Sequence, residues 1–321
     1  MIELMKGIQS ILESCMPLKK GERVLVIAYD EGRSTWLGQL FMAVAKSMGC
    51  ETVLALMTQR EIAGHEPPAA VAAAMKNVDS IIQICEKASV THTTARKEAT
   101  AAGARFGLLF DIPPEDLRKG VSSADIRLVQ ERTEKLAEKL TQAKVARVTT
   151  PLGTDLTLNL AGRQSIPIHP RGPIVFAMPY YAEAAIAPVD GSAEGLIVMD
   201  LSMRGWGGLL RGPLRCRVKQ GKVVEISGSG PEADRLRQIA ARDENASNVA
   251  ELGIGTSHII PGEMLGTSSD FARANTVHIG IGRNNDIGGN TLSLIHQDGL
   301  MSRPTVELDH QFVMKDGVLL V

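Results

Sequence analysis

The first 110 residues contain four short apolar runs that alternate with helix-like segments, and this alternation limits the possible folds most. Continuous apolar runs of this length are typical of strands that are buried on both faces of a parallel sheet. The intervening segments carry helix signals, such as Ser34 as a potential N-cap and Gly49 as a potential terminator of the second helix. We therefore predict a parallel sheet covered by helices on both faces. The expected strands span residues 24–28, 53–56, 81–85 and 106–110.

The pattern changes after a charged, amphipathic helix that we expect at residues 124–143. Beyond it, short runs of alternating residues are separated by Gly and Pro turns, as in the expected hairpins of residues 146–160 and 214–226. Such a pattern predicts an α+β domain whose strands are mostly antiparallel. We therefore predict an α/β, Rossmann-like domain over residues 1–145 and an α+β domain over residues 146–321. No Gly-x-Gly-x-x-Gly or Walker-type loop follows the first strand, so we predict no nucleotide site there.

The clearest candidate for a metal site is the sequence His296-Gln297-Asp298. Residues 291–298 alternate as a strand does. Because successive side chains of a strand point to opposite faces, His296 and Asp298 would share one face. An imidazole beside a carboxylate can bind zinc, iron, cobalt or manganese. A single His-x-Asp pair is also compatible with a core histidine beside an exposed aspartate.

Two neighbouring residues favour the metal interpretation. His278 lies in an apolar segment, residues 275–282, that the sequence predicts to be a buried strand ending in a glycine-rich turn. Glu251 lies between Val249-Ala250 and Leu252-Gly253, and a carboxylate in such a segment is costly to bury unless it is paired or bound to a cation. Either residue alone could belong to an ordinary core. Together with His296 and Asp298, they indicate one metal site in the α+β domain, which would then be the catalytic domain.

Two more residues are candidates for the same site. Glu183 lies among small and apolar residues in the segment 178–188, where the alternative is a surface glutamate at a strand edge. His92 follows the third expected strand, close to a helix N-terminus. It would therefore lie near the carboxyl edge of the parallel sheet, where open α/β sheets bind ligands. The alternative for His92 is a surface histidine near a helix cap.

The composition excludes several classes of partner. A net charge of −1 and an aromatic content of 3% predict no binding to nucleic acid or to a membrane. The sequence shows no apolar run of membrane-spanning length and no signal-peptide pattern. Its four cysteines, at positions 15, 50, 85 and 216, lack metal-type or disulfide-type spacing. We therefore expect reduced thiols and a cytoplasmic location.

The C-terminal half resembles the metalloaminopeptidase family of aminopeptidase T. The shared motifs are a Glu-x-x-x-Ala-Pro run at Glu183, an Ala-Glu-Leu-Gly run at Glu251, a strand histidine at His278 and a closing His296-x-Asp298. This resemblance implies a two-metal hydrolase that cleaves an amide or the N-terminal peptide bond of a short peptide. The metals would be two zinc, cobalt or manganese ions held by these five residues. For this hydrolase we expect Glu251 or another nearby carboxylate as general base, His92 as a substrate-orienting or proton-donating residue, and a homo-oligomer, as is common among such relatives.

The sequence is also similar to enzymes of the 2,5-dihydroxypyridine 5,6-dioxygenase type, which share this fold. The similarity implies, as the alternative, a ring-cleaving dioxygenase with one iron(II) held by His296, Asp298 and either His278 or Glu251. His92 would then be the base that acts on a substrate hydroxyl. Glu251 stands where those enzymes carry a histidine, which favours the hydrolase. A third hypothesis is a binding protein without activity, although no candidate ligand position is visibly replaced.

Overall fold

The computed structural model describes residues 1–60, 65–91, 93–172, 174–175 and 178–321. The chain forms two compact units. The first unit comprises Met1–Gln130 and His169–Tyr181, and the second comprises Glu131–Ile168 and Ala182–Val321. His92, which the sequence analysis singled out, lies outside the described residues, so its role stays a prediction.

The division between the units lies within helix α6 (Ser123–Gln142), whereas the sequence analysis placed a boundary after residue 145. The structure divides the chain closer to the N-terminus than predicted because Leu136 and Leu140, in the second half of α6, belong to the hydrophobic core of the second unit. The short strand β8 (Ile174–Val175) belongs to the first unit, where it pairs in parallel with β4 (Arg105–Phe110).

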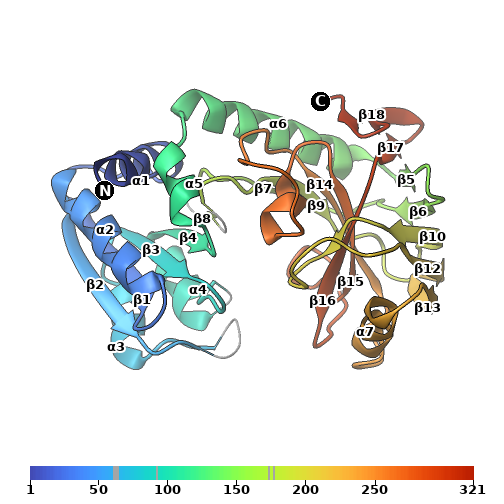
Figure 1. Ribbon diagram of the computed structural model, residues 1–321, viewed down its shortest axis with the longest axis horizontal. Coiled ribbons are helices and arrows are strands. Elements are labelled where there is room, and N and C mark those ends of the chain that lie inside the picture. Colours follow the sequence, from blue (N-terminus) through green and yellow to red (C-terminus); the bar gives the residue numbers. More distant parts are fainter. Residues whose placement is uncertain (61–64, 92, 173, 176–177) are drawn as a thin grey trace. The chain divides into compact units, whose positions relative to one another are not determined.

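The first unit contains a five-stranded parallel sheet in the order β2-β1-β3-β4-β8 (Figure 1). Alternate residues of β1 contact different layers: Leu25 and Ile27 pack in a core with Val71 and Ala95 of the helices α3 and α4, whereas Ala28 lies beside Gly38 of α2. Helices therefore cover both faces, as the sequence predicts. The strands are β1 (Arg23–Tyr29), β2 (Glu51–Met57), β3 (Ser80–Cys85), β4 (Arg105–Phe110) and β8. The helices are α1 (Ile2–Cys15), α2 (Ser34–Ser47), α3 (Ala69–Met75), α4 (Thr94–Ala101) and α5 (Pro114–Lys119).

The second unit contains two sheets whose strand pairs are antiparallel, which confirms the predicted α+β class. The eight-stranded sheet has the order β13-β12-β10-β6-β5-β17-β18-β19 and the six-stranded sheet has the order β11-β16-β15-β14-β9-β7. In the first of these sheets the strands are β5 (Val145–Thr149), β6 (Asp155–Asn159), β10 (Glu194–Met199), β12 (Leu214–Lys219), β13 (Lys222–Ser227), β17 (Thr305–Leu308), β18 (Gln311–Lys315) and β19 (Val318–Leu319). In the second they are β7 (Ile166–Ile168), β9 (Glu183–Ile186), β11 (Ser202–Met203), β14 (Val249–Gly255), β15 (Val277–Gly282) and β16 (His296–Met301). The unit also contains helix α7 (Pro231–Ala240) and the 3-10 helix η1 (Ser268–Ala272).

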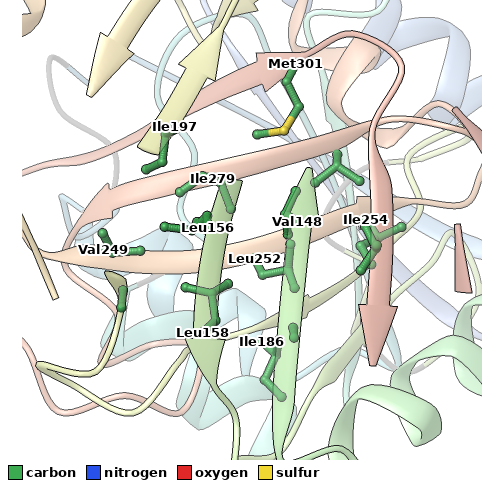
Figure 2. Close-up of a cluster of buried hydrophobic side chains, with 14 of the residues drawn as sticks. Val148, Leu156, Leu158, Ile186, Ile197, Val249, Leu252, Ile254, Ile279 and Met301 are labelled. Atoms are coloured by element: carbon green, nitrogen blue, oxygen red, sulfur yellow. The ribbon is translucent and has the colours of Figure 1, made fainter. Parts of the chain in front are cut away.

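The core of the second unit lies between the two sheets. Figure 2 shows Val148 and Leu156 of the eight-stranded sheet beside Leu252 and Ile279 of the six-stranded sheet, all in one buried cluster. In β9 and β15, and in β14 from Glu251 onward, every second residue contributes to this core: Ala184 and Ile186, Val277, Ile279 and Ile281, and Leu252 and Ile254. The intervening residues point to the opposite face, and that face carries the candidate site.

Two expectations from the composition can be compared with the structure. The four cysteines are free and buried. Among the described residues, no helix is both long and apolar enough to cross a membrane.

Candidate metal centre

The five predicted metal ligands lie together on the six-stranded sheet, on the face away from the core. Glu183 begins β9, Glu251 lies in β14, His278 lies in β15, and His296 and Asp298 lie in β16. The strand β14 shows why they share a face: Leu252 and Ile254 enter the core, so Glu251 must point the other way. The predicted strand over residues 291–298 begins only at His296, but His296 and Asp298 still share a face as predicted.

Glycines make the room for these side chains. Gly280 pairs with Glu251 on one side and with Asp298 on the other, and a Cβ atom on it would lie 2.8 Å from Oδ1 of Asp298. Gly253 pairs with His278, and a Cβ atom there would lie 2.0 Å from Nε2 of the imidazole. The sequence predicts a glycine-rich turn after His278, but Gly280 and Gly282 belong to β15 itself. Glycine alternates with apolar residues after Glu251 and after His278, and this alternation is the sequence signal that could have indicated a strand with space for the site on one face.

The contacts divide the five residues into two overlapping groups. Nε2 of His296 lies 2.8 Å from Oε2 of Glu251 and 3.0 Å from Oδ1 of Asp298. Nε2 of His278 lies 3.5 Å from Oε2 of Glu183 and 3.7 Å from Oε1 of Glu251. Glu251 therefore offers one oxygen to each histidine. In each group, one ligand atom from each of three residues lies within 4.8 Å of the others: Glu183, Glu251 and His278 in one, and Glu251, His296 and Asp298 in the other.

Burial makes this a suitable place for a cation. The side chains of Glu183, Glu251 and Asp298 are 4%, 6% and 1% exposed. Oδ1 of Asp298 lies 3.0 Å from Nε2 of His296 and Oδ2 lies 3.2 Å from Nε of Arg204, and within the described part of the chain neither oxygen accepts a hydrogen bond of regular geometry. Buried carboxylates cost free energy unless positive charges lie close to them, and this cluster brings three carboxylates together. Because carboxylate and imidazole donors suit several divalent ions, these five residues fit a divalent metal.

The pKa shifts within the cluster also favour the binding of a cation. Burial alone would lower the pKa of His296, but the neighbouring carboxylates of Asp298 and Glu251 outweigh it and raise this pKa well above its usual value. Burial alone would raise the pKa of Glu251, but hydrogen bonds with His278 and His296 lower it to about 2. The cluster thus strongly favours an added positive charge. A metal ion would supply that charge while taking the place of the histidine protons.

His296 is also oriented by a neighbour that the sequence analysis missed. Its Nδ1 lies 2.8 Å from the backbone oxygen of Arg283. Since a carbonyl only accepts hydrogen bonds, Nδ1 carries a proton, and Nε2 is the nitrogen that faces the two carboxylates and would become a metal ligand when an ion replaces its proton. Metal-ligating histidines commonly donate their second nitrogen to a carbonyl in this way.

Two aspartates hold the loop of residues 283–295, which connects β15 and β16. Asp190 accepts hydrogen bonds from Asn284 (3.0 Å), Thr291 (2.7 Å) and Arg163 (2.6 Å). Asp243 accepts two more from the last part of the loop. The loop carries the carbonyl of Arg283 at one end and leads into His296 at the other, so these bonds help to fix the orientation of His296.

We predict that the Asp190→Asn variant is less stable than the parent by about 2 kcal/mol at neutral pH. Burial tends to raise the pKa of Asp190, but hydrogen bonds from Asn284, Thr291 and Arg163 lower it to about 2. A lowered pKa in the folded state stabilises the fold above the ordinary pKa of aspartate, and this contribution disappears as the pH falls towards about 2. Denaturant unfolding at pH 7, 4 and 3 should show the difference between variant and parent shrinking. Asp234→Asn, at an exposed carboxylate, is the control, and an equal loss at all three pH values would contradict the prediction.

A second prediction concerns Gly280. Gly280→Ala should weaken metal binding about 10-fold or more, because its Cβ would lie 2.8 Å from Oδ1 of Asp298 and 3.1 Å from Cε1 of His296. Isothermal titration with Mn²⁺ measures this affinity. The control is Gly212→Ala, where the nearest atom to the new Cβ would be 3.9 Å away. Unchanged affinity in Gly280→Ala would show that Asp298 and His296 do not bind the ion from these positions.

Comparison with known proteins identifies first the fold and then the family. The structure of 2,5-dihydroxypyridine dioxygenase from Pseudomonas putida KT2440 is 17% identical, with a TM-score of 0.83 over 99% of this chain and 97% of that chain. Wild-type AmpT from Thermus thermophilus is also 17% identical, with a TM-score of 0.68 over 100% of this chain and 99% of that chain. Both resemblances drawn from the sequence are therefore confirmed for the fold. No curated protein matches the chain.

The family model of 2,5-dihydroxypyridine 5,6-dioxygenase (NicX) matches residues 3–321, so the chain belongs to this family. It is the family that the sequence analysis named as the alternative. The principal expectation, a two-metal aminopeptidase, is not confirmed, although AmpT shares the fold.

Proposed function

We propose that this protein is a metal-dependent dioxygenase that opens a small, hydroxylated aromatic or pyridine ring. The observation that carries this proposal is the match of the dioxygenase family model to residues 3–321. The similarity in fold to 2,5-dihydroxypyridine dioxygenase supports it further. A dioxygenase adds both atoms of O₂ to the ring-opened product, so the reaction needs no external reductant.

The group Glu251, His296 and Asp298 would hold the iron(II) in this proposal. Bound iron(II) supplies the redox chemistry that allows O₂ to react with an electron-rich ring. The set departs from the usual two histidines and one carboxylate of non-haem iron oxygenases, because it contains one imidazole and two carboxylates. The other imidazole of the cluster, His278, has its Nε2 closer to Glu183 and Glu251.

The residues of this chain would divide the remaining work. The carbonyl of Arg283 keeps Nε2 of His296 available as a ligand. Glu183 lies 3.5 Å from His278 and would accept a proton from that imidazole or from a substrate hydroxyl next to it. His92 keeps its predicted role as a base towards the substrate hydroxyl.

A two-metal hydrolase is the second candidate, and one specific observation favours it. Glu251 belongs to both groups of potential ligands and presents a different oxygen to each histidine. Glu251 would therefore be a ligand common to both groups, and two bound ions would supply Lewis-acid chemistry for the hydrolysis of an amide. The fold that the chain shares with AmpT supports this candidate.

The decisive experiment measures metal content and activity in the same preparation. The protein is purified anaerobically without a His tag, and its metals are counted by elemental analysis. It is then assayed for O₂ uptake with 2,5-dihydroxypyridine, and for cleavage of short peptides after loading with zinc, cobalt or manganese. One iron per chain with O₂-dependent loss of the pyridine would support the dioxygenase. Two ions per chain with peptide cleavage and no O₂ uptake would overturn it in favour of the hydrolase.

A further inference from the structure

The two oxygens of Asp298 face different partners. Oδ1 lies 3.0 Å from Nε2 of His296, on the side of the other candidate ligands. Oδ2 lies 3.2 Å from Nε of Arg204, whose side chain is 35% exposed. Only Oδ1 is therefore directed at the place where an ion would be shared with His296 and Glu251.

The backbone of Arg204 is fixed to the strand that carries Asp298. Arg204 follows β11, which pairs with β16 at Leu300 and Gly299. Its N–H donates to the backbone oxygen of Asp298 at 3.0 Å, and its own carbonyl accepts a hydrogen bond from Nε2 of Gln297 at 3.0 Å. The position of Arg204 relative to Asp298 is thus set by the sheet.

The side chain of Arg204 is held as well. Its guanidinium carbon lies 5.2 Å from the centre of the ring of Phe271, which is fully buried. This distance allows a cation–π interaction. The same ring contacts His278 edge to face, with the two ring centres 5.4 Å apart. Phe271 belongs to η1, a segment that the sequence analysis did not connect with the site.

We propose that Arg204 is a positioning residue of the metal site, which keeps Oδ2 of Asp298 occupied so that Oδ1 alone binds the ion. This inference rests on the metal site of the proposed function, and it holds for a dioxygenase or a hydrolase. Ligating carboxylates are commonly oriented by such outer partners, and their loss typically weakens metal binding 10- to 100-fold. An opposing effect exists, because the positive charge of Arg204 also repels a cation. The orientation of Asp298 by Arg204 outweighs this repulsion in its effect on metal affinity.

The test compares the Mn²⁺ affinity of the parent chain of 321 residues with that of Arg204→Met and Arg204→Lys, and uses Co²⁺ absorption spectra as a measure of coordination geometry. We expect Arg204→Met to bind Mn²⁺ about 10- to 100-fold more weakly and to change the Co²⁺ spectrum. The Mn²⁺ affinity of Arg204→Lys should lie between those of the parent and Arg204→Met, because lysine keeps the positive charge but not the planar guanidinium. Arg235→Met is the matched control, since Arg235 also lies over an aromatic ring, Trp206, at 4.5 Å. The Mn²⁺ affinity of Arg235→Met should lie within about 2-fold of that of the parent.

The outcomes separate this inference from the metal site itself. If the parent binds neither ion, the metal site and the proposed function fail together. If the parent binds Mn²⁺ and Arg204→Met binds it equally well with an unchanged Co²⁺ spectrum, only the role of Arg204 is overturned. Tighter binding by Arg204→Met would also overturn it, because repulsion would then be the larger effect. Circular dichroism and thermal unfolding verify that each variant is folded.

Discussion

Replacing His296 with alanine is expected to weaken metal binding by more than 100-fold and to abolish activity with it, while the fold survives. Nε2 of His296 lies within 3.0 Å of both Glu251 and Asp298, so the imidazole is central to one group of ligands. Loss of an outer partner of a metal ligand costs up to about 100-fold in affinity, and loss of the ligand itself should cost more. The imidazole contacts the carboxylates of Glu251 and Asp298 and the carbonyl of Arg283 and lies outside the hydrophobic core cluster, so its truncation removes little hydrophobic packing.

Metal content after dialysis, measured by elemental analysis, tests the His296 prediction directly. Thermal unfolding of the same preparation shows whether the variant remains folded. His65→Ala, which removes an exposed histidine of the first unit, controls for the loss of an imidazole that binds metal at the surface. Full metal occupancy in His296→Ala would refute the assignment of His296 as a ligand.

The identity of the candidate ligands could be predicted because a strand has a fixed period. Asp298 must share a face with His296, whatever the strand is paired with. The same rule applies to Glu251, since Leu252 and Ile254 both enter the core and Glu251 must therefore point to the opposite face. Burial of a carboxylate among apolar residues was the second signal, because such a group needs a partner.

The pairing that brings these residues together could not be predicted. Glu183 reaches the site because β9 pairs with β14, a strand that lies far along the chain. The register that places Gly280 between Glu251 and Asp298 depends on an irregularity in β14 between Val249 and Glu251. Strand periodicity carries no information about either feature. The supporting residues, such as Arg204 and Arg283, were missed for the same reason, because their roles exist only through contacts across strands.

The α/β class of the first unit was predictable for a different reason. Its strands are continuous apolar runs, and helices separate them at a regular spacing. The two-residue strand β8 was not predictable, since it is too short to show any period. The cytoplasmic location and the homo-oligomeric state stay predictions.

The second prediction with a large expected effect compares Glu251 with Glu183. We expect Glu251→Gln to lose more than 100-fold in metal affinity, because Glu251 belongs to both groups of ligands. Glu183→Gln affects only one group and leaves Glu251, His296 and Asp298 unchanged. A glutamine has nearly the same shape as a glutamate but carries no charge, so each variant tests the charge of one carboxylate. Glu183→Gln thus serves as the matched control for Glu251→Gln.

The number of ions that Glu183→Gln retains should also distinguish the two candidate functions. If one iron is held by Glu251, His296 and Asp298, Glu183→Gln keeps one ion per chain, like the parent, and only its turnover falls. If Glu251 is a shared ligand of two ions, Glu183→Gln should keep one of the two ions and lose peptide cleavage. Elemental analysis of both variants beside the parent gives these numbers. Full occupancy in Glu251→Gln would contradict both arrangements, because each requires the carboxylate that contacts both histidines.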